Sequence, residues 1–178
     1  MAGHAAFLRG VNLGRDRRVS GAELRELFEG MGFAGVATFR TSGNVVFASP
    51  RKPGAARIER ELERALGYDV AIFLRTAAEV RAIAEHQPFP TEVIEASAGK
   101  LQVALLPSKP AAGVRSRALE LATDEDRLAF GDRELYWLPS GGTRDSALDM
   151  KTIERLVGPS TMRTKGTLER LAAKYFAS

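Results

Sequence analysis

The order of predicted secondary-structure elements in residues 1–76 constrains the fold more than any other feature of this sequence. Short apolar runs predict strands, and apolar residues spaced by three and four predict helices. Ser20 and Glu23 predict a capping box at the start of the first helix, and Gly32 ends it. The full set comprises strands at 4–9, 36–41, 45–48 and 69–75 and helices at 21–31 and 55–66. This strand–helix–strand–strand–helix–strand order is that of the ferredoxin-like unit.

Residues 100–178 repeat this order less regularly. A helix at 77–85 precedes the Pro88-Phe89-Pro90 break, so residues 77–99 are interpreted as a linker helix and loop. Strands are then predicted at 100–106, 127–130 and 134–138 and helices at 114–122, 146–157 and 165–176, the last in place of a clear final strand. We therefore expect an α+β fold of two tandem ferredoxin-like halves, 1–76 and 100–178, with extra C-terminal helices.

Several predicted strands are apolar on both faces. In the first strand, Ala5 and Phe7 lie opposite Ala6 and Leu8. A lone ferredoxin-like sheet leaves one face open to water, whereas these strands predict that both faces are covered. We expect helices on one face and the other half, or the extra helices, on the second, so that the two halves pack into one compact body.

The composition is that of a globular protein without disulfides. Hydrophobic residues make up 44% and charged residues 27% of the 178 residues, and cysteine is absent. No stretch reaches the roughly 18 apolar residues of a membrane span, and no signal-like segment opens the sequence. These features predict a cytoplasmic protein with no membrane partner.

The basic character of the chain is slight. The sequence pI is about 9.7, but the net charge is only +4, and no polybasic tail or stripe occurs. The RNA-recognition module has the same element order and stacks bases on aromatic side chains of its sheet. Here the candidate aromatics, Phe7 and Phe47, are expected in the core, because their strands are apolar on both faces. Nucleic acid is therefore kept as a partner but is not favoured.

Two signatures are expected to meet at one edge of the first sheet: Leu8-Arg9-Gly10-Val11-Asn12-Leu13-Gly14 and Thr41-Ser42-Gly43-Asn44. In a ferredoxin-like sheet the end of the first strand and the hairpin between the next two strands lie at the same edge. The first helix begins there too, and its N-terminus presents N–H groups and the positive end of its dipole. Arginines and amides beside a helix N-terminus suit a phosphate or carboxylate. The candidate ligand-binding residues are Arg9, Asn12, Arg40, Ser42 and Asn44.

The same residues also fit a purely architectural role. Gly10 and Gly14 can shape the turn from strand to helix, and Gly43 and Asn44 can shape the hairpin. Asn12 belongs to a residue type that often caps loops. The glycine spacing matches neither a P-loop nor the G-x-G-x-x-G dinucleotide motif.

No catalytic or metal-binding constellation is recognisable. The two histidines, His4 and His86, lie far apart in the sequence, and cysteine is absent. No G-x-S-x-G turn is present to expose a serine nucleophile. Asp124, Glu125 and Asp126 lie in a loop before a strand and are expected to be solvated or to neighbour a helix end. We therefore predict no metal and no cofactor, and whether the chain is an enzyme stays open.

The sequence resembles a bacterial domain-of-unknown-function family, number sixteen ninety-seven. The resemblance lies in the two signatures, the Leu-rich helix at 24–28, Gly32-Phe33 and Val45-Val46-Phe47. It extends to the C-terminus, where Thr161-Met162-Arg163 with Thr167 and Leu171 is similar to the family's closing T-x-R-x-x-x-T-x-x-x-L. The resemblance implies a ferredoxin-like fold and no established activity. It also adds Arg163 to the candidate ligand-binding residues.

The leading hypothesis is a protein that binds a phosphate-bearing or other anionic ligand at the edge formed by the two signatures. One alternative is an enzyme that acts on a phosphorylated metabolite through arginine electrostatics, which needs neither histidine nor metal. The other is a homo-oligomerising interaction protein without a small ligand, since edge strands and a basic loop can form an interface.

Overall fold

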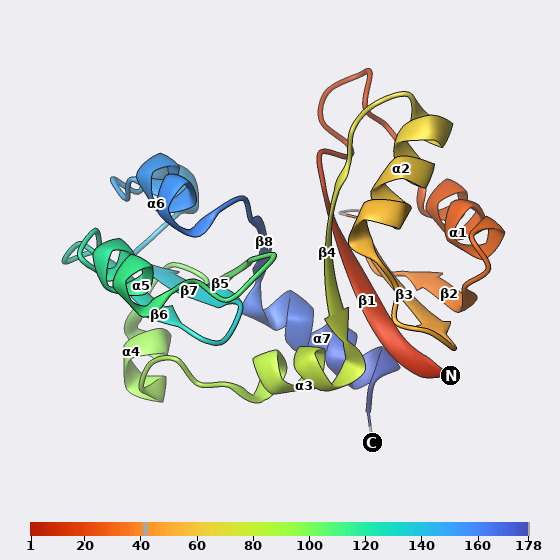
Figure 1. The fold of residues 1–178 in the computed structure, drawn as a ribbon. Coiled ribbons are helices and arrows are strands. Elements are labelled where there is room, and N and C mark those ends of the chain that lie inside the picture. The colour runs from red at the N-terminus through yellow and green to blue at the C-terminus, as the bar shows by residue number, and fades with distance from the viewer. Residues whose placement is uncertain (41–42, 178) are drawn as a thin grey trace. The chain divides into compact units, whose positions relative to one another are not determined.

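The computed structural model describes residues 1–40 and 43–177 of the chain. The chain divides into two compact units, one comprising Met1–Arg81 and Leu171–Ser178 and the other comprising Ala82–Arg170. The divisions fall within two helices, α3 (Ala77–Glu85) and α7 (Lys165–Tyr175). Each unit is built around its own four-stranded sheet (Figure 1).

The first unit is an antiparallel sheet with two helices on one face. Its strands are β1 (Ala2–Arg9), β2 (Ala34–Thr38), β3 (Asn44–Ser49) and β4 (Ala71–Thr76), in the order β2-β3-β1-β4. Helices α1 (Gly21–Gly30) and α2 (Ala55–Leu66) cover the same face of this sheet (Figure 1). The predicted ferredoxin-like arrangement of the first half is thereby confirmed.

The helices of the first unit begin and end at the predicted local signals. Ser20 Oγ accepts a hydrogen bond from Glu23 N at 3.1 Å, and Ser20 N donates to Glu23 Oε2 at 2.6 Å. These two bonds complete the capping box of α1. Helix α2 ends at Gly67, whose φ of +80° is the left-handed conformation that glycine adopts without steric cost.

Both faces of the first sheet are buried. On the helix-covered face, Leu8 and Phe47 pack in a core shared with α1 and α2. On the opposite face, Phe7 is buried, and a Cβ built at Gly3 would lie 3.2 Å from the ring of Phe176. The C-terminal residues of the first unit therefore pack on this second face. The prediction that Phe7 and Phe47 belong to the core is confirmed.

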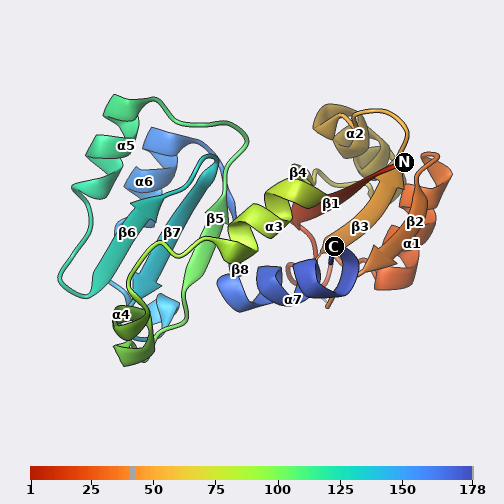
Figure 2. The same ribbon diagram turned by 90° about the horizontal axis from the view of Figure 1, so that it is seen from below.

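The second unit repeats the same sheet order. Strands β5 (Gln102–Leu105), β6 (Asp126–Phe130), β7 (Glu134–Pro139) and β8 (Thr161–Thr164) are arranged as β6-β7-β5-β8. Figure 2 shows β6, β7 and β5 side by side. Helices α5 (Ala112–Leu119) and α6 (Met150–Val157) enclose the core of this unit, and a 3-10 turn (Thr143–Asp145) precedes α6. The chain thus contains two tandem ferredoxin-like halves.

Two elements of the second unit were not predicted. Strand β8 lies where the sequence shows no clear last strand, because Thr-Met-Arg-Thr is too short and too polar to resemble a buried strand. Its pairing with β5 defines it, with Ala104 opposite Met162 and Val103 opposite Arg163. Helix α4 (Thr91–Ala96) lies within the segment interpreted as a linker and begins directly after Pro90.

Asp126 is buried, and the prediction that it is solvated is wrong. Its carboxylate accepts hydrogen bonds from Trp137 Nε1 at 2.8 Å, Ser146 Oγ at 2.7 Å and Thr123 Oγ1 at 2.9 Å, and the residue is only 2% exposed. Burial by itself raises the pKa of Asp126, but the hydrogen bonds from Ser146, Trp137 and Thr123 outweigh burial and lower it. Because Asp126 follows two other acidic residues, Asp124 and Glu125, the sequence pattern did not show that its carboxylate belongs to the core.

Candidate functional site

The loop after β1 is closed by Asn12. Asn12 Oδ1 accepts a hydrogen bond from Val19 N at 3.1 Å, and Asn12 N donates to Arg17 O. Asn12 also adopts a φ of +55°, a left-handed conformation that asparagine tolerates better than most residues. The side-chain oxygen that the sequence offered to a ligand therefore holds the backbone of the loop.

The same loop is tied to the start of the last strand of the sheet. Arg17 Nη2 forms an ion pair with Asp69 Oδ1 at 3.0 Å, and its guanidinium lies over the ring of Tyr68, 5.2 Å from the ring centroid. Burial raises the pKa of Tyr68, Arg17 opposes this, and Glu23 adds to it. The Tyr68 hydroxyl is buried and has no hydrogen-bond partner among the described residues. It is a donor that nothing in the described chain uses.

The hairpin signature lies beside the end of β1, as the topology predicts. Leu8 N donates to Gly43 O at 2.9 Å, and a Cβ at Gly43 would lie 2.9 Å from Val11 Cγ2 and 3.0 Å from Leu8 Cβ. The φ of Gly43 is +72°, so a side chain there would meet both steric and conformational strain. Asn44 is 1% exposed, and its Nδ2 donates to Phe39 O at 2.9 Å. Ser42 lies outside the described residues.

Two candidate arginines of the first unit reach the surface. Arg9 ends β1 and Arg40 follows β2, and both are exposed. Arg40 has a φ of +59° and lies over the ring of Phe39, 5.6 Å from its centroid. The N-terminus of α1 at this edge already has an anion beside it, the carboxylate of Glu23. The hydrogen bonds of the capping box, first with the backbone and then with the side chain of Ser20, lower the pKa of Glu23.

Arg163 belongs to the other unit. It lies on β8, where its Nη1 donates to Thr161 Oγ1 at 2.8 Å and to Met162 O at 2.9 Å. Burial lowers the pKa of Arg163 to about 10, so the guanidinium still carries its charge at neutral pH. Its equivalent in the first sheet is the buried Arg75, which pairs with β1 as Arg163 pairs with β5. The six candidate residues are therefore divided between two units.

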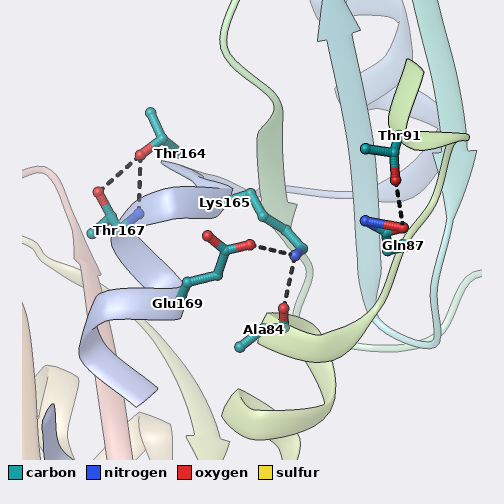
Figure 3. Close-up of polar contacts among 7 residues, drawn as sticks. All are labelled: Ala84, Gln87, Thr91, Thr164, Lys165, Thr167 and Glu169. Carbon is teal, nitrogen blue, oxygen red and sulfur yellow. Dashed lines mark hydrogen bonds and ion pairs between the residues drawn. The ribbon is translucent and has the colours of Figure 1, made fainter. Parts of the chain in front are cut away.

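A cavity of about 350 Å³ lies in the second unit at the start of α7. Lys165, the first residue of that helix, is buried and donates from Nζ to Glu169 Oε1 and to Ala84 O, both at 2.8 Å (Figure 3). Thr164 Oγ1 accepts from Thr167 N at 3.2 Å and thereby caps the helix (Figure 3). The cavity combines a buried cation, a helix start and apolar lining residues.

Sequence reasoning did not identify this cavity. Its residues come from two segments, 86–101 and 164–170, which are far apart along the chain. A local sequence signal does exist for one of the two segments, the one that begins at Thr164. The Arg163-Thr164 pair before α7 repeats the Arg75-Thr76 pair before α3, where Thr76 and Glu79 form a further capping box. That repeat could have predicted both the end of β8 and the helix start that lines the cavity.

The histidines have structural surroundings. The ring of His4 stacks on Phe47 at a centroid distance of 5.6 Å, and its Nδ1 is 2.9 Å from Ala2 O. His86 contacts the ring of Tyr136 at 4.9 Å. Within residues 1–40 and 43–177, no three or more His, Asp or Glu residues are grouped to bind a metal. No helix in these residues is long and apolar enough to cross a membrane.

Comparison with known proteins identifies the family. The model of the family described as "Protein of unknown function (DUF1697)" matches residues 1–136. The chain belongs to this family. Comparison with curated proteins gives no match. The family match ends before the closing motif around Arg163, so a ligand-binding role for that residue stays a prediction.

A solved structure of the same fold extends the comparison beyond the family match. The conserved bacterial protein SP0830 from Streptococcus pneumoniae has a TM-score of 0.71 and 19% sequence identity, over 98% of each chain. At this identity the likeness establishes the fold of this DUF1697 member over nearly its whole length. Its function therefore has to be argued from its own residues.

Proposed function

We propose that this DUF1697 protein binds a phosphate-bearing or other anionic ligand at the edge of the first unit where β1 and the β2–β3 hairpin end. The observation that carries the proposal is the exposure of Arg9 and Arg40 on two segments that the hydrogen bond from Leu8 N to Gly43 O joins. Guanidinium groups form charge-assisted and often bidentate hydrogen bonds with phosphate and carboxylate.

The electrostatics of this edge support an anionic ligand. Arg17 and Asp69 neutralise each other in an ion pair. Two further exposed carboxylates lie at this edge, Asp16 in the loop and Glu23 in the first turn of α1. The remaining arginines of the edge are all exposed: Arg9, Arg15, Arg18 and Arg40. This excess of positive charge attracts anions, and because the groups are exposed the attraction weakens as salt is added.

In this proposal Asn12 and Asn44 support the site and do not contact the ligand. Asn12 holds the loop that carries Arg15 and Arg18, and Asn44 holds the backbone before Arg40. Binding groups presented on a backbone that is already fixed lose less entropy when the ligand binds.

A calorimetric titration of the full chain with tripolyphosphate tests the proposal. The double variant Arg9→Gln/Arg40→Gln is expected to weaken binding roughly tenfold or more, which is the loss of at least one charge-assisted hydrogen bond. The matched control is Arg51→Gln/Lys52→Gln, which also removes two exposed charges. These residues follow Ser49, which pairs with Ala2 at the other end of β1 from Arg9. Its affinity is expected to stay within about twofold of the parent chain, because only long-range attraction is lost.

Two outcomes count against the proposal. One is the absence of heat and of thermal stabilisation when the parent chain meets tripolyphosphate at low salt. The other is equal weakening by the two double variants, which would assign binding to net charge alone. Circular dichroism of each variant shows whether the fold is retained, since all four side chains are exposed and their removal should leave it intact.

A further inference from the structure

Positive charge is concentrated on the wall of the cavity in the second unit. Lys100, Lys165 and Arg170 line it, together with one carboxylate, Glu169. The first turn of α7 adds the positive end of the helix dipole at the same place. Lys165 is paired with Glu169 there, so Arg170 is the cation whose unfavourable position beside a helix N-terminus an anionic ligand would offset.

Arg170 is turned back over the start of α7. A Cβ built at Gly166 would lie 3.6 Å from Arg170 Nη1 and 3.7 Å from Nη2, so the guanidinium covers the first turn of the helix. It has no hydrogen-bond or ion-pair partner among residues 1–40 and 43–177. The exposed carboxylate nearest along the helix, Glu169, is already paired with Lys165.

Lys165 lines the cavity and has one hydrogen-bond donor beyond the two that its described partners use. An ammonium group has three N–H donors, and two of them are used by Glu169 and Ala84. The residue is only 8% exposed, so an anion in contact with it would be shielded from water. Charge interactions are stronger in such a place than on the open surface.

We propose that this cavity binds a small molecule carrying a phosphate or carboxylate on a compact apolar body. The anionic group accepts hydrogen bonds from Lys165, Arg170 and the N–H of Gly166, and the apolar body contacts Ile94 and Leu101. The volume of about 350 Å³ is near the lower end of the roughly 300–1,000 Å³ typical of small-molecule sites. The site is separate from the edge of the first unit and does not rest on the function proposed there.

Phenyl phosphate is a suitable probe because it joins a phosphate to one small ring. The ¹⁵N-labelled full chain is titrated to millimolar phenyl phosphate, and the amide signals of Gly166 and Gly99 are followed, since both glycines line the cavity. Both signals are expected to shift and saturate together. Benzyl alcohol, which has the ring without the anion, is expected to leave them unchanged.

Arg170→Gln and Arg155→Gln form a matched pair of variants. Both side chains are exposed and both changes remove one positive charge, but Arg155 lies on α6, outside the cavity. Arg170→Gln is expected to raise the dissociation constant of phenyl phosphate about tenfold, and Arg155→Gln less than about twofold.

Three results would overturn the proposal. They are no saturable shift of the Gly166 and Gly99 signals, an equal effect of the two variants, and binding of benzyl alcohol as tight as that of phenyl phosphate. Shifts confined to Gly10, Gly14 and Gly43 would place the anion at the edge of the first unit instead. The glycine signals therefore separate the two proposed sites in one experiment.

Discussion

The carboxylate of Asp126 is the acceptor on which three side chains of the second unit converge, and replacing it should weaken that unit. Asp126→Ala leaves the buried Trp137 N–H without an acceptor, which costs about 1–3 kcal/mol. The hydroxyls of Ser146 and Thr123 are less buried and can turn to water, so each lost bond costs about 0.5–1 kcal/mol. We expect the free energy of unfolding of the second unit to fall by about 2–5 kcal/mol.

Asp126→Asn is the matched control for this change. The amide keeps the shape of the side chain and an acceptor oxygen for Trp137, but loses the charge. Its expected cost is about 1 kcal/mol. Trp137 is the only tryptophan of the chain and lies in the second unit, so its fluorescence during urea unfolding follows that unit. Equal stability of Asp126→Ala and Asp126→Asn would refute the reasoning.

The pH dependence of the same pair tests the charge itself. Folding lowers the pKa of Asp126, so the folded chain binds the proton less tightly than the unfolded chain. The stabilisation by the ionised carboxylate is therefore complete above the unfolded-state pKa and is lost as the pH falls through the folded-state pKa. The stability gap between the parent chain and Asp126→Asn should be constant near neutral pH and close in acid. A gap that widens in acid contradicts the assigned direction.

Three further predictions concern single residues. Gly43→Ala should destabilise the first unit by about 2–4 kcal/mol, and Gly67→Ala by about 1 kcal/mol. Both glycines have a positive φ, but only Gly43 has neighbours that an added Cβ would meet. Equal losses of stability in urea unfolding would contradict this. Asn12→Ala should lower the free energy of unfolding by about 1–2 kcal/mol, because it removes the hydrogen bond from Val19 N and places alanine at a positive φ. Thermal unfolding measures this loss, and an unchanged stability would argue against an architectural role for Asn12. Lys165→Met should lower the free energy of unfolding by about 1–3 kcal/mol, and Lys109→Met by less than about 0.5 kcal/mol. Both lysines form ion pairs, but the side chain of Lys165 is 10% exposed and that of Lys109 is 58% exposed. Similar losses in urea unfolding would show that burial does not set the strength of these ion pairs.

The fold of the first unit was predictable because its signals are local. Apolar spacing, the Ser20–Glu23 capping box and Gly67 set the limits of α1 and α2 within one or two residues. The second unit was less predictable because β8 exists through its pairing with β5, which no short segment encodes. Asp126 was misread for the same reason, since two of its three partners, Trp137 and Ser146, come from other parts of the chain.

The candidate sites show what topology can and cannot predict. Sheet order was enough to bring the end of β1 beside the hairpin, and Leu8 and Gly43 are hydrogen-bonded there. It could not show that the side chains of Asn12 and Asn44 turn toward the backbone, because that depends on local dihedral angles and partners. The cavity at Lys165 needed two distant segments to be folded first.

The signature of this family identifies the fold more directly than it identifies chemistry. Gly43 fits where no side chain can, and Asn12 and Asn44 satisfy backbone groups of the two loops. Residues of this kind are fixed by the geometry of the turn whatever ligand the protein binds. Recognition through them therefore establishes family and fold while leaving activity open. Within the first signature, Arg9 is the exposed cation at the end of β1, and its substitution is therefore the most direct test of anion binding at this edge.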